Sequence, residues 1–167
     1  PPDGADAAPL TGLITLARAW GVEVGTNVVV DVSSVGQMLG AGPSMPVVAT
    51  YPDHPITENF ALITAFPLAR SITPVDGGTN GRTAQPIATT SAQSWAETDL
   101  ATLKDGQSQP QFDQATDMAG PLALAVSAEN LTNNARLVAI GDADFVIDGN
   151  YGAYANGSFF NYAVDWT

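Results

Sequence analysis

Few side chains in this 167-residue sequence have the type and spacing that catalysis or ligand binding requires. The only histidine, His54, lies in the turn-forming segment YPDHPIT at residues 51–57, after an apolar run. Beyond the end of a strand it could act as a general base or a ligand, because open α/β sheets bind ligands there. The alternative, which we favour, is that His54 closes a rigid turn and hydrogen-bonds a backbone carbonyl. No Gly-x-Ser-x-Gly segment offers a serine nucleophile.

Two carboxylates, Asp142 and Asp144, directly follow the apolar run at residues 135–140. Oxygen ligands at this spacing could hold Mg²⁺ or Ca²⁺. The EF-hand pattern does not fit, because position 146 is valine. The favoured alternative is that Asp142 caps the turn while Asp144 faces solvent or caps a local helix. We therefore assign no metal, and the lone histidine and absent cysteine also disfavour structural zinc.

A third candidate region is the polar segment that contains Ser91 and Trp95. Ser91 is a potential helix cap, and Trp95 either covers the sheet or stacks on a sugar. Neither Gly-x-Gly-x-x-Gly nor Gly-Lys-Ser/Thr is present, so no phosphate-binding loop is predicted. We assign no cofactor and no catalytic residue.

The composition limits the classes of molecule that this chain can bind. Five Lys and Arg residues stand against 17 Asp and Glu, for a net charge of −12. This charge repels nucleic acid and anionic lipid, and nucleic-acid binding needs clustered cations. The absence of cysteine excludes thiol catalysis, thiolate metal sites and disulfides. No apolar run reaches the roughly 18 residues of a membrane span.

The elements that would position these side chains follow from the hydrophobic pattern. Helical spacing predicts helices at residues 10–20 and 158–166, with Asn156 or Ser158 as the cap of the second. A short helix is expected at 57–62. Strands are expected at 28–30, 47–51, 83–90, 122–126 and 135–140, and from Pro67 to Ile72. The Gly-rich segment 75–81 predicts a turn between two strands, and Pro86 makes the following strand an edge or bulged one. Residues 33–45 are expected to be loop.

This order predicts a single α/β domain over residues 10–167. Residues 1–9 are expected to form a flexible N-terminal segment, and residues 104–120 an exposed loop inserted into the domain. If the strands are parallel, His54, Ser91, Trp95, Asp142 and Asp144 share one edge of the sheet.

Seven segments in order resemble the extracytoplasmic domain of GldG-like auxiliary proteins of ABC transport systems, also described as uncharacterised or gliding-motility-type components. They are ARAWGV at 17–22, VVVD at 28–31, YPDHPIT at 51–57, FPLARS at 66–71, TTSAQSWAE at 89–97, LVAIGDADF at 137–145 and NGSFFNYAVDW at 156–166. The resemblance covers roughly residues 10–167.

The resemblance implies a three-layer α/β sandwich, flavodoxin-like or similar to class I glutamine amidotransferases. The chain is expected to begin after the first strand and helix of such a domain. It also implies a membrane protein whose soluble domain lies on the extracytoplasmic face of the bacterial cytoplasmic membrane, beside an ATPase and a permease. Amidotransferases use a cysteine nucleophile, and this chain has none.

The leading hypothesis is therefore a non-enzymatic domain that binds a partner protein or an extracellular ligand, with a saccharide as one candidate. Its candidate binding residues are His54, Ser91, Trp95, Asp142 and Asp144. Two alternatives stay open: a hydrolase that uses Asp142 and Asp144, with or without a metal, and a purely structural scaffold. The hydrolase requires both carboxylates to share a pocket with His54.

Overall fold

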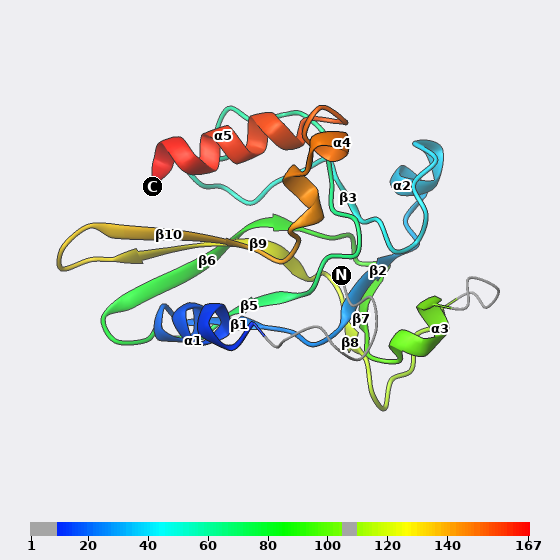
Figure 1. Ribbon diagram of the computed structural model, residues 1–167, viewed down its shortest axis with the longest axis horizontal. Helices are drawn as coiled ribbons and strands as arrows, with labels where there is room; N and C mark the ends of the chain where they lie inside the picture. Colours follow the sequence, from blue (N-terminus) through cyan, green and yellow to red (C-terminus); the bar gives the residue numbers. More distant parts are fainter. Residues whose placement is uncertain (1–9, 105–109) are drawn as a thin grey trace.

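The computed structural model describes residues 10–104 and 110–167. The expected flexible segment at residues 1–9 lies outside the described residues, as does part of the expected loop at 104–120. Helices and strands alternate irregularly along the chain (Figure 1). The helices are α1 (Thr11–Ala19), α2 (Ser34–Met38), α3 (Leu100–Lys104), α4 (Asp148–Tyr151), α5 (Asn156–Trp166) and the 3₁₀ helix η1 (Asp144–Val146).

The described strands form small antiparallel sheets. They are β1 (Val22–Val24), β2 (Val28–Asp31), β3 (Val47–Val48), β4 (Thr64–Ala65), β5 (Ile72–Pro74), β6 (Arg82–Thr89), β7 (Ser94–Glu97), β8 (Met118–Ala119), β9 (Ala123–Asn130) and β10 (Ala135–Ile140). The sheet orders are β10-β9-β6, β2-β7-β8, β1-β5 and β3-β4. A mixed α/β fold is confirmed. The finer flavodoxin-like prediction is not, because all described strand pairs are antiparallel whereas such a sheet is parallel.

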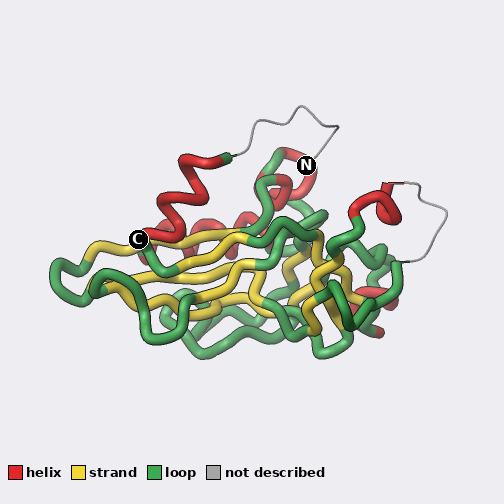
Figure 2. The backbone as a smooth tube through the Cα atoms, turned by 90° about the horizontal axis from the view of Figure 1, so that it is seen from below, coloured by secondary structure: helices red, strands yellow, loops and turns green. Residues whose placement is uncertain are grey.

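Two apolar clusters hold the domain together, one on each face of the long strands. Strand β9 serves both, since neighbouring side chains of a strand point to opposite faces. Ala125 belongs to the larger cluster, as does Phe159 of α5, whereas Val126 belongs to the smaller one, as does Ala17 of α1. Accordingly, α1 and α5 flank the long strands on opposite sides in Figure 1, and α1 stands to one side of the strand layer in Figure 2.

Several elements match the sequence prediction. Helix α1 forms where the apolar spacing predicts a helix. It ends before Gly21, whose φ of 74° is typical of the residue after a helix. The glycine-rich turn joins β5 to β6, and a Cβ at Gly78 would collide with the Arg82 carbonyl oxygen. Strand β6 is an end strand of its sheet, and its register shifts at Pro86, as expected for a bulge.

Other predictions were wrong. The expected loop at 33–45 contains α2, and the expected helix at 57–62 is a series of turns. The strand predicted after Pro67 is replaced by β4, which precedes the proline, and by β5, which begins at Ile72. Strands β1 and β7 were missed, because both are short and are defined by pairing with residues far along the chain.

The start of the last helix also differs from the prediction. Neither Asn156 nor Ser158 is the cap, because α5 begins at Asn156 itself with Ala155 before it. The buried Asn156 amide instead bonds the backbone N–H and carbonyl of Ala65 and the carbonyl of Phe145. It thereby fastens α5 to β4 and η1. Within the described ranges, no helix is both long and apolar enough to cross a bilayer.

Candidate functional site

His54 is buried and fixed by its own turn. Its carbonyl accepts hydrogen bonds from the backbone N–H groups of Thr57 and Glu58, both at 2.8 Å. Its ring Nδ1 lies 3.0 Å from the backbone nitrogen of Ile56. Because an amide N–H can only donate, Nδ1 must offer its lone pair. The proton of the neutral imidazole is therefore on Nε2.

The second ring nitrogen faces Ser127 in the middle of β9. Nε2 lies 3.0 Å from Ser127 Oγ, and that hydroxyl lies 3.5 Å from the carbonyl oxygen of Gln85 on β6. With the proton on Nε2, the histidine donates and the serine hydroxyl accepts. A general base must accept the serine proton instead, and this requires the opposite tautomer. The pair has the residue types of a nucleophile and base, but its hydrogen-bond direction is reversed.

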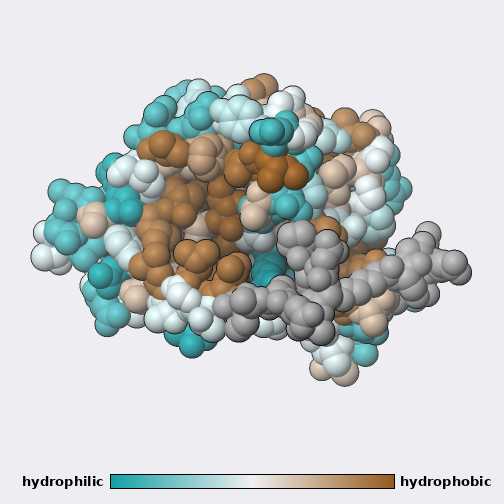
Figure 3. Space-filling model, in the orientation of Figure 1, coloured by the Kyte–Doolittle hydropathy of each residue, from teal (hydrophilic) through white to brown (hydrophobic). Residues whose placement is uncertain are grey.

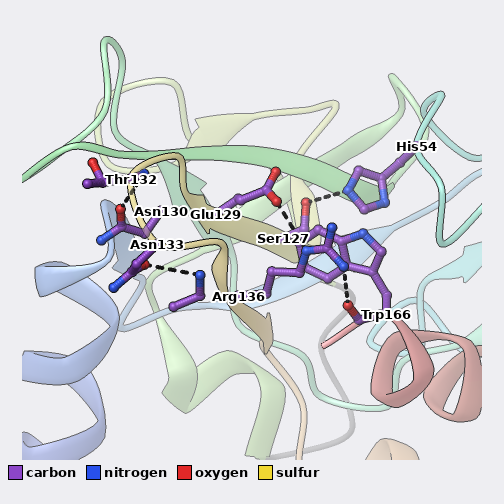
Figure 4. A network of polar contacts seen from close by, with 9 residues as sticks. His54, Ser127, Glu129, Asn130, Thr132, Asn133, Arg136 and Trp166 are labelled. Carbon is purple, nitrogen blue, oxygen red and sulfur yellow. Dashed lines mark hydrogen bonds and ion pairs between the residues drawn. The ribbon is translucent and has the colours of Figure 1, made fainter.

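An exposed ion pair between Arg136 and Glu129 lies beside the His54–Ser127 contact (Figure 4). Arg136 of β10 lies 3.1 Å from Glu129 Oε1, and its Nη1 donates to the Trp166 carbonyl oxygen at 2.9 Å. The Arg136 guanidinium also stacks over the Trp166 ring at 4.7 Å from its centroid. The Trp166 ring packs edge-on against His54, with centroids 5.0 Å apart. The C-terminal end of α5 thus covers the imidazole.

These groups surround a cavity of about 130 Å³. We call it the His54 cavity, and it is lined by His54, Thr83, Ala84, Gln85, Ser127, Glu129 and Trp166. Burial lowers the pKa of His54 below its usual 6.5; Glu129 opposes this shift, whereas Arg136 adds to it. The imidazole is therefore neutral at pH 7. Within the described residues, no group of three or more His, Asp or Glu side chains could hold a metal ion.

Ser91 holds a loop together instead of capping a helix. Its hydroxyl donates to Asp31 Oδ1 at 2.9 Å, and its backbone N–H donates to Asp31 Oδ2 at 3.0 Å. Asp31 is buried at the end of β2 and also accepts a bond from the backbone of Ser33. A buried carboxylate that accepts several hydrogen bonds holds its neighbouring segments together, because burial is tolerated only while those bonds are made. The expected helix after Ser91 is replaced by β7.

Trp95 is part of the small sheet. Its side chain is only 6% exposed, and its Nε1 donates to Glu97 Oε2 at 3.1 Å. Stacking on a sugar needs an open ring face, so this burial removes the basis for a saccharide site at Trp95. The other expected role, covering of the sheet, agrees with its position on β7 between β2 and β8.

Asp142 and Asp144 lie at a separate cavity. It is a groove of about 400 Å³ between α1 and β10, which we call the α1–β10 groove. Its main apolar lining is Leu10, Leu13, Leu16, Leu68, Leu137 and Ala139, and its polar lining is Arg70, Asp142 and Asp144. Asp142 caps the turn as expected, because its Oδ1 accepts the backbone N–H of Asp144 at 2.7 Å. Its other oxygen is buried and has no hydrogen-bond partner within the described structure.

The five candidate residues are therefore not gathered into one site. His54 lines one cavity and both carboxylates line another, while Ser91 and Trp95 line neither. Leu137, on the groove side, alternates along β10 with Arg136, which meets Glu129 at the His54 cavity. The antiparallel strands explain the separation, because their ends do not share one edge.

Comparison with known proteins identifies the family of this chain. A family described as an ABC-type uncharacterized transport system matches residues 2–164. The chain belongs to this family. The resemblance of the seven ordered segments to auxiliary components of ABC transport systems is thus confirmed at the level of this family. No curated protein matches this ABC transport family member.

The similar solved structures include one described as the mmIFT52 N-terminal domain. The TM-score is 0.59 at 11% sequence identity, and the match covers 93% of this chain. It spans 57% of the other chain. At this identity the likeness concerns the fold alone.

The sequence analysis predicted neither the contact between His54 and Ser127 nor the α1–β10 groove. Ser127 was left outside the strand predicted at 122–126, although a serine inside the apolar segment LALAVSA at 122–128 is a signal for a buried polar contact. The groove depends on how α1 lies against β10. No local pattern encodes that placement.

Proposed function

We propose that this chain is the non-enzymatic, extracytoplasmic domain of a GldG-like auxiliary protein in an ABC-type transport system, and that it binds a partner protein. Membership in the ABC transport family supports the association with transport. The extracytoplasmic location and the ATPase and permease as partners rest on the family resemblance.

The observation that carries the non-enzymatic part is the direction of the His54–Ser127 hydrogen bond. Nδ1 accepts the Ile56 N–H, so Nε2 has no lone pair with which to activate Ser127. Glu129, the nearby carboxylate, pairs with Arg136. In a working triad, the carboxylate would instead bond Nδ1 and set the other tautomer.

The hydrolase alternative lacks its acid–base partner. Asp142 and Asp144 line the α1–β10 groove, whereas His54 lines the His54 cavity. Asp142 and Asp144 remain candidate binding residues, while Ser91, Trp95 and His54 have structural contacts that account for them. A purely structural scaffold would lack any partner, so an association experiment separates it from the proposal.

The test uses the complete reading frame around this segment. Membrane fractions of cells expressing it should contain the protein, and external protease should cleave this domain in intact spheroplasts. Pull-down after mild detergent extraction should recover an ATPase and a permease. A soluble, protease-protected protein without these partners would overturn the proposal.

Two variants address the enzymatic alternative directly. His54→Gln and Ser127→Ala in the full-length protein should leave recovery of the ATPase and permease unchanged, provided that the variants fold. The purified chain should show no Ser127-dependent hydrolysis of activated esters such as p-nitrophenyl acetate. Hydrolysis that disappears in Ser127→Ala would contradict the structural assignment of this pair.

A further inference from the structure

The α1–β10 groove is an open, mostly apolar feature of the described surface, and large side chains on its α1 wall are exposed. Leu10, Leu13 and Leu16 of the α1 region are 61%, 62% and 49% exposed, although Ala17 of the same helix is buried. Figure 3 shows a continuous hydrophobic area over α1 and the neighbouring strands. Helix α1 thus buries Ala17 against the sheet, with Ile14 partly buried, and leaves its leucines largely uncovered. Contiguous apolar surface of this kind marks interaction sites.

The groove has an acidic end. Asp142 and Asp144 follow β10, and the Oδ2 atom of Asp142 is buried without a hydrogen-bond partner in the described structure. Arg70 lines the same groove but forms no ion pair with either carboxylate in the described ranges. Both carboxylates line the groove at this end. They give it a negative charge beside its apolar walls.

We propose that the α1–β10 groove binds an apolar peptide segment of a partner protein, with a Lys or Arg side chain of that segment paired with Asp142. The inference rests on the proposed partner-binding function and identifies its surface. Apolar side chains of the segment would cover Leu10, Leu13 and Leu16, and its cation would lie at the acidic end of the groove. Charge pairing of this type selects the partner and fixes its direction in the groove.

Other occupants fit less well. A bilayer with anionic headgroups is repelled by a net charge of −12 and by the two carboxylates at the groove. A symmetric contact with a second copy would join two chains of the same strong negative charge. A peptide segment with a basic residue supplies both an apolar cover for the leucines and a cation for the acidic end of the groove.

The test is a selection with a defined probe. A phage-displayed library of random peptides of about twelve residues is selected on the purified chain and counter-selected on the empty support, since anchors in peptide grooves recur within a few turns or strand repeats. Selected peptides should combine spaced apolar residues with Lys or Arg. Their affinities are then measured by fluorescence anisotropy at pH 7.5.

Three variants give the expected pattern. Leu13→Asp should weaken binding by at least about tenfold, because truncated anchor contacts dominate such interfaces. Asp142→Asn should weaken it by roughly three- to tenfold and abolish the preference over a peptide whose basic residue is replaced by Glu. Met38→Asp alters another exposed apolar residue, on α2 outside the groove, and should change nothing.

Three results would overturn the inference. They are a selection that enriches no peptides, peptides that bind Leu13→Asp as tightly as the wild type, and a wild-type dimer in sedimentation that Leu13→Asp dissociates. The last would assign the groove to a second copy. The proposed function is tested separately by association of the full-length protein with an ATPase and a permease, so either idea can fail without the other.

Discussion

The two cavities on opposite sides of the long strands differ in how their polar groups are satisfied. In the His54 cavity each ring nitrogen of the histidine has a partner, Glu129 pairs with Arg136, and Trp166 covers the ring. In the α1–β10 groove, leucines are half exposed, and one carboxylate oxygen has no hydrogen-bond partner among the described residues. A closed network of polar contacts stabilises a fold, whereas an open apolar groove with an unpaired acceptor suits a ligand.

Among variants in the two cavities, the largest effect on stability is expected at His54. His54→Ala removes both ring hydrogen bonds and the contact with Trp166, and should lower the free energy of unfolding by about 3 kcal/mol, as for other buried hydrogen-bonded side chains. Urea denaturation at pH 7 measures it. A loss below about 1 kcal/mol, the scale of surface contacts, would contradict the structural role.

Ser127→Ala should cost less, about 1–2 kcal/mol, because it leaves the Nε2–H of His54 buried without an acceptor. The double variant His54→Ala with Ser127→Ala should cost less than the sum of the single variants, since the two side chains share one hydrogen bond. Strict additivity in urea denaturation would mean that this bond contributes nothing.

Asp142→Asn should stabilise the protein at pH 7. Burial raises the pKa of Asp142 from 3.8 to about 6, so the folded state holds a proton that the unfolded state releases between these values. Stability therefore rises as pH falls from about 6 towards 3.8. After allowance for solvent screening of this partly exposed group, we expect a gain of about 1 kcal/mol from the substitution at pH 7.

The check is thermal unfolding of both proteins across this pH range. Asn keeps the oxygen that accepts the Asp144 N–H. The difference between variant and wild type should shrink on acidification. A variant that is less stable at pH 7 would show that the charged carboxylate has a partner in the folded protein.

His54 should make the stability of the protein depend on pH in the opposite direction. Its pKa is lowered from 6.5 in the folded protein, so below that pH the unfolded state binds the additional proton. The wild type should therefore lose a contribution to stability as pH falls below about 6.5. In His54→Gln this acid-side loss should be absent, which pH-dependent urea denaturation can measure.

The smallest effect on stability is expected in the groove wall. Leu13→Ser should change the free energy of unfolding by less than about 0.5 kcal/mol, because Leu13 is 62% exposed. Phe159→Ala, at a fully buried position, is the matched comparison and should cost about 3–5 kcal/mol. A comparable loss in both variants would mean that the groove wall is part of the core.

Local patterns predicted the elements that depend on local chemistry. Helix α1, the glycine-rich turn before β6, and the strands β2 and β10 follow from apolar spacing and turn residues. The capping role of Asp142 was also a local inference, and the structure confirms it. These features need only a few neighbouring residues.

Long-range contacts escaped prediction. Ser127 reaches His54 across 73 positions of the chain, and Asn156 reaches Ala65 across 91. Strand β7 is recognised through its pairing with β2, not through its polar sequence SWAE. The candidate residues were expected to share an edge on the premise of parallel strands, and antiparallel pairing places them apart.

The most direct test of the account is the tautomer of His54, read from ¹⁵N NMR of the ring nitrogens at pH 7. The account predicts a neutral imidazole with its proton on Nε2 and an unprotonated Nδ1 that accepts the Ile56 N–H. The spectrum should be unaffected by Asp142→Asn. A ring protonated on Nδ1, with Nε2 free to take the Ser127 proton, would contradict the structural assignment and reopen the case for an enzyme.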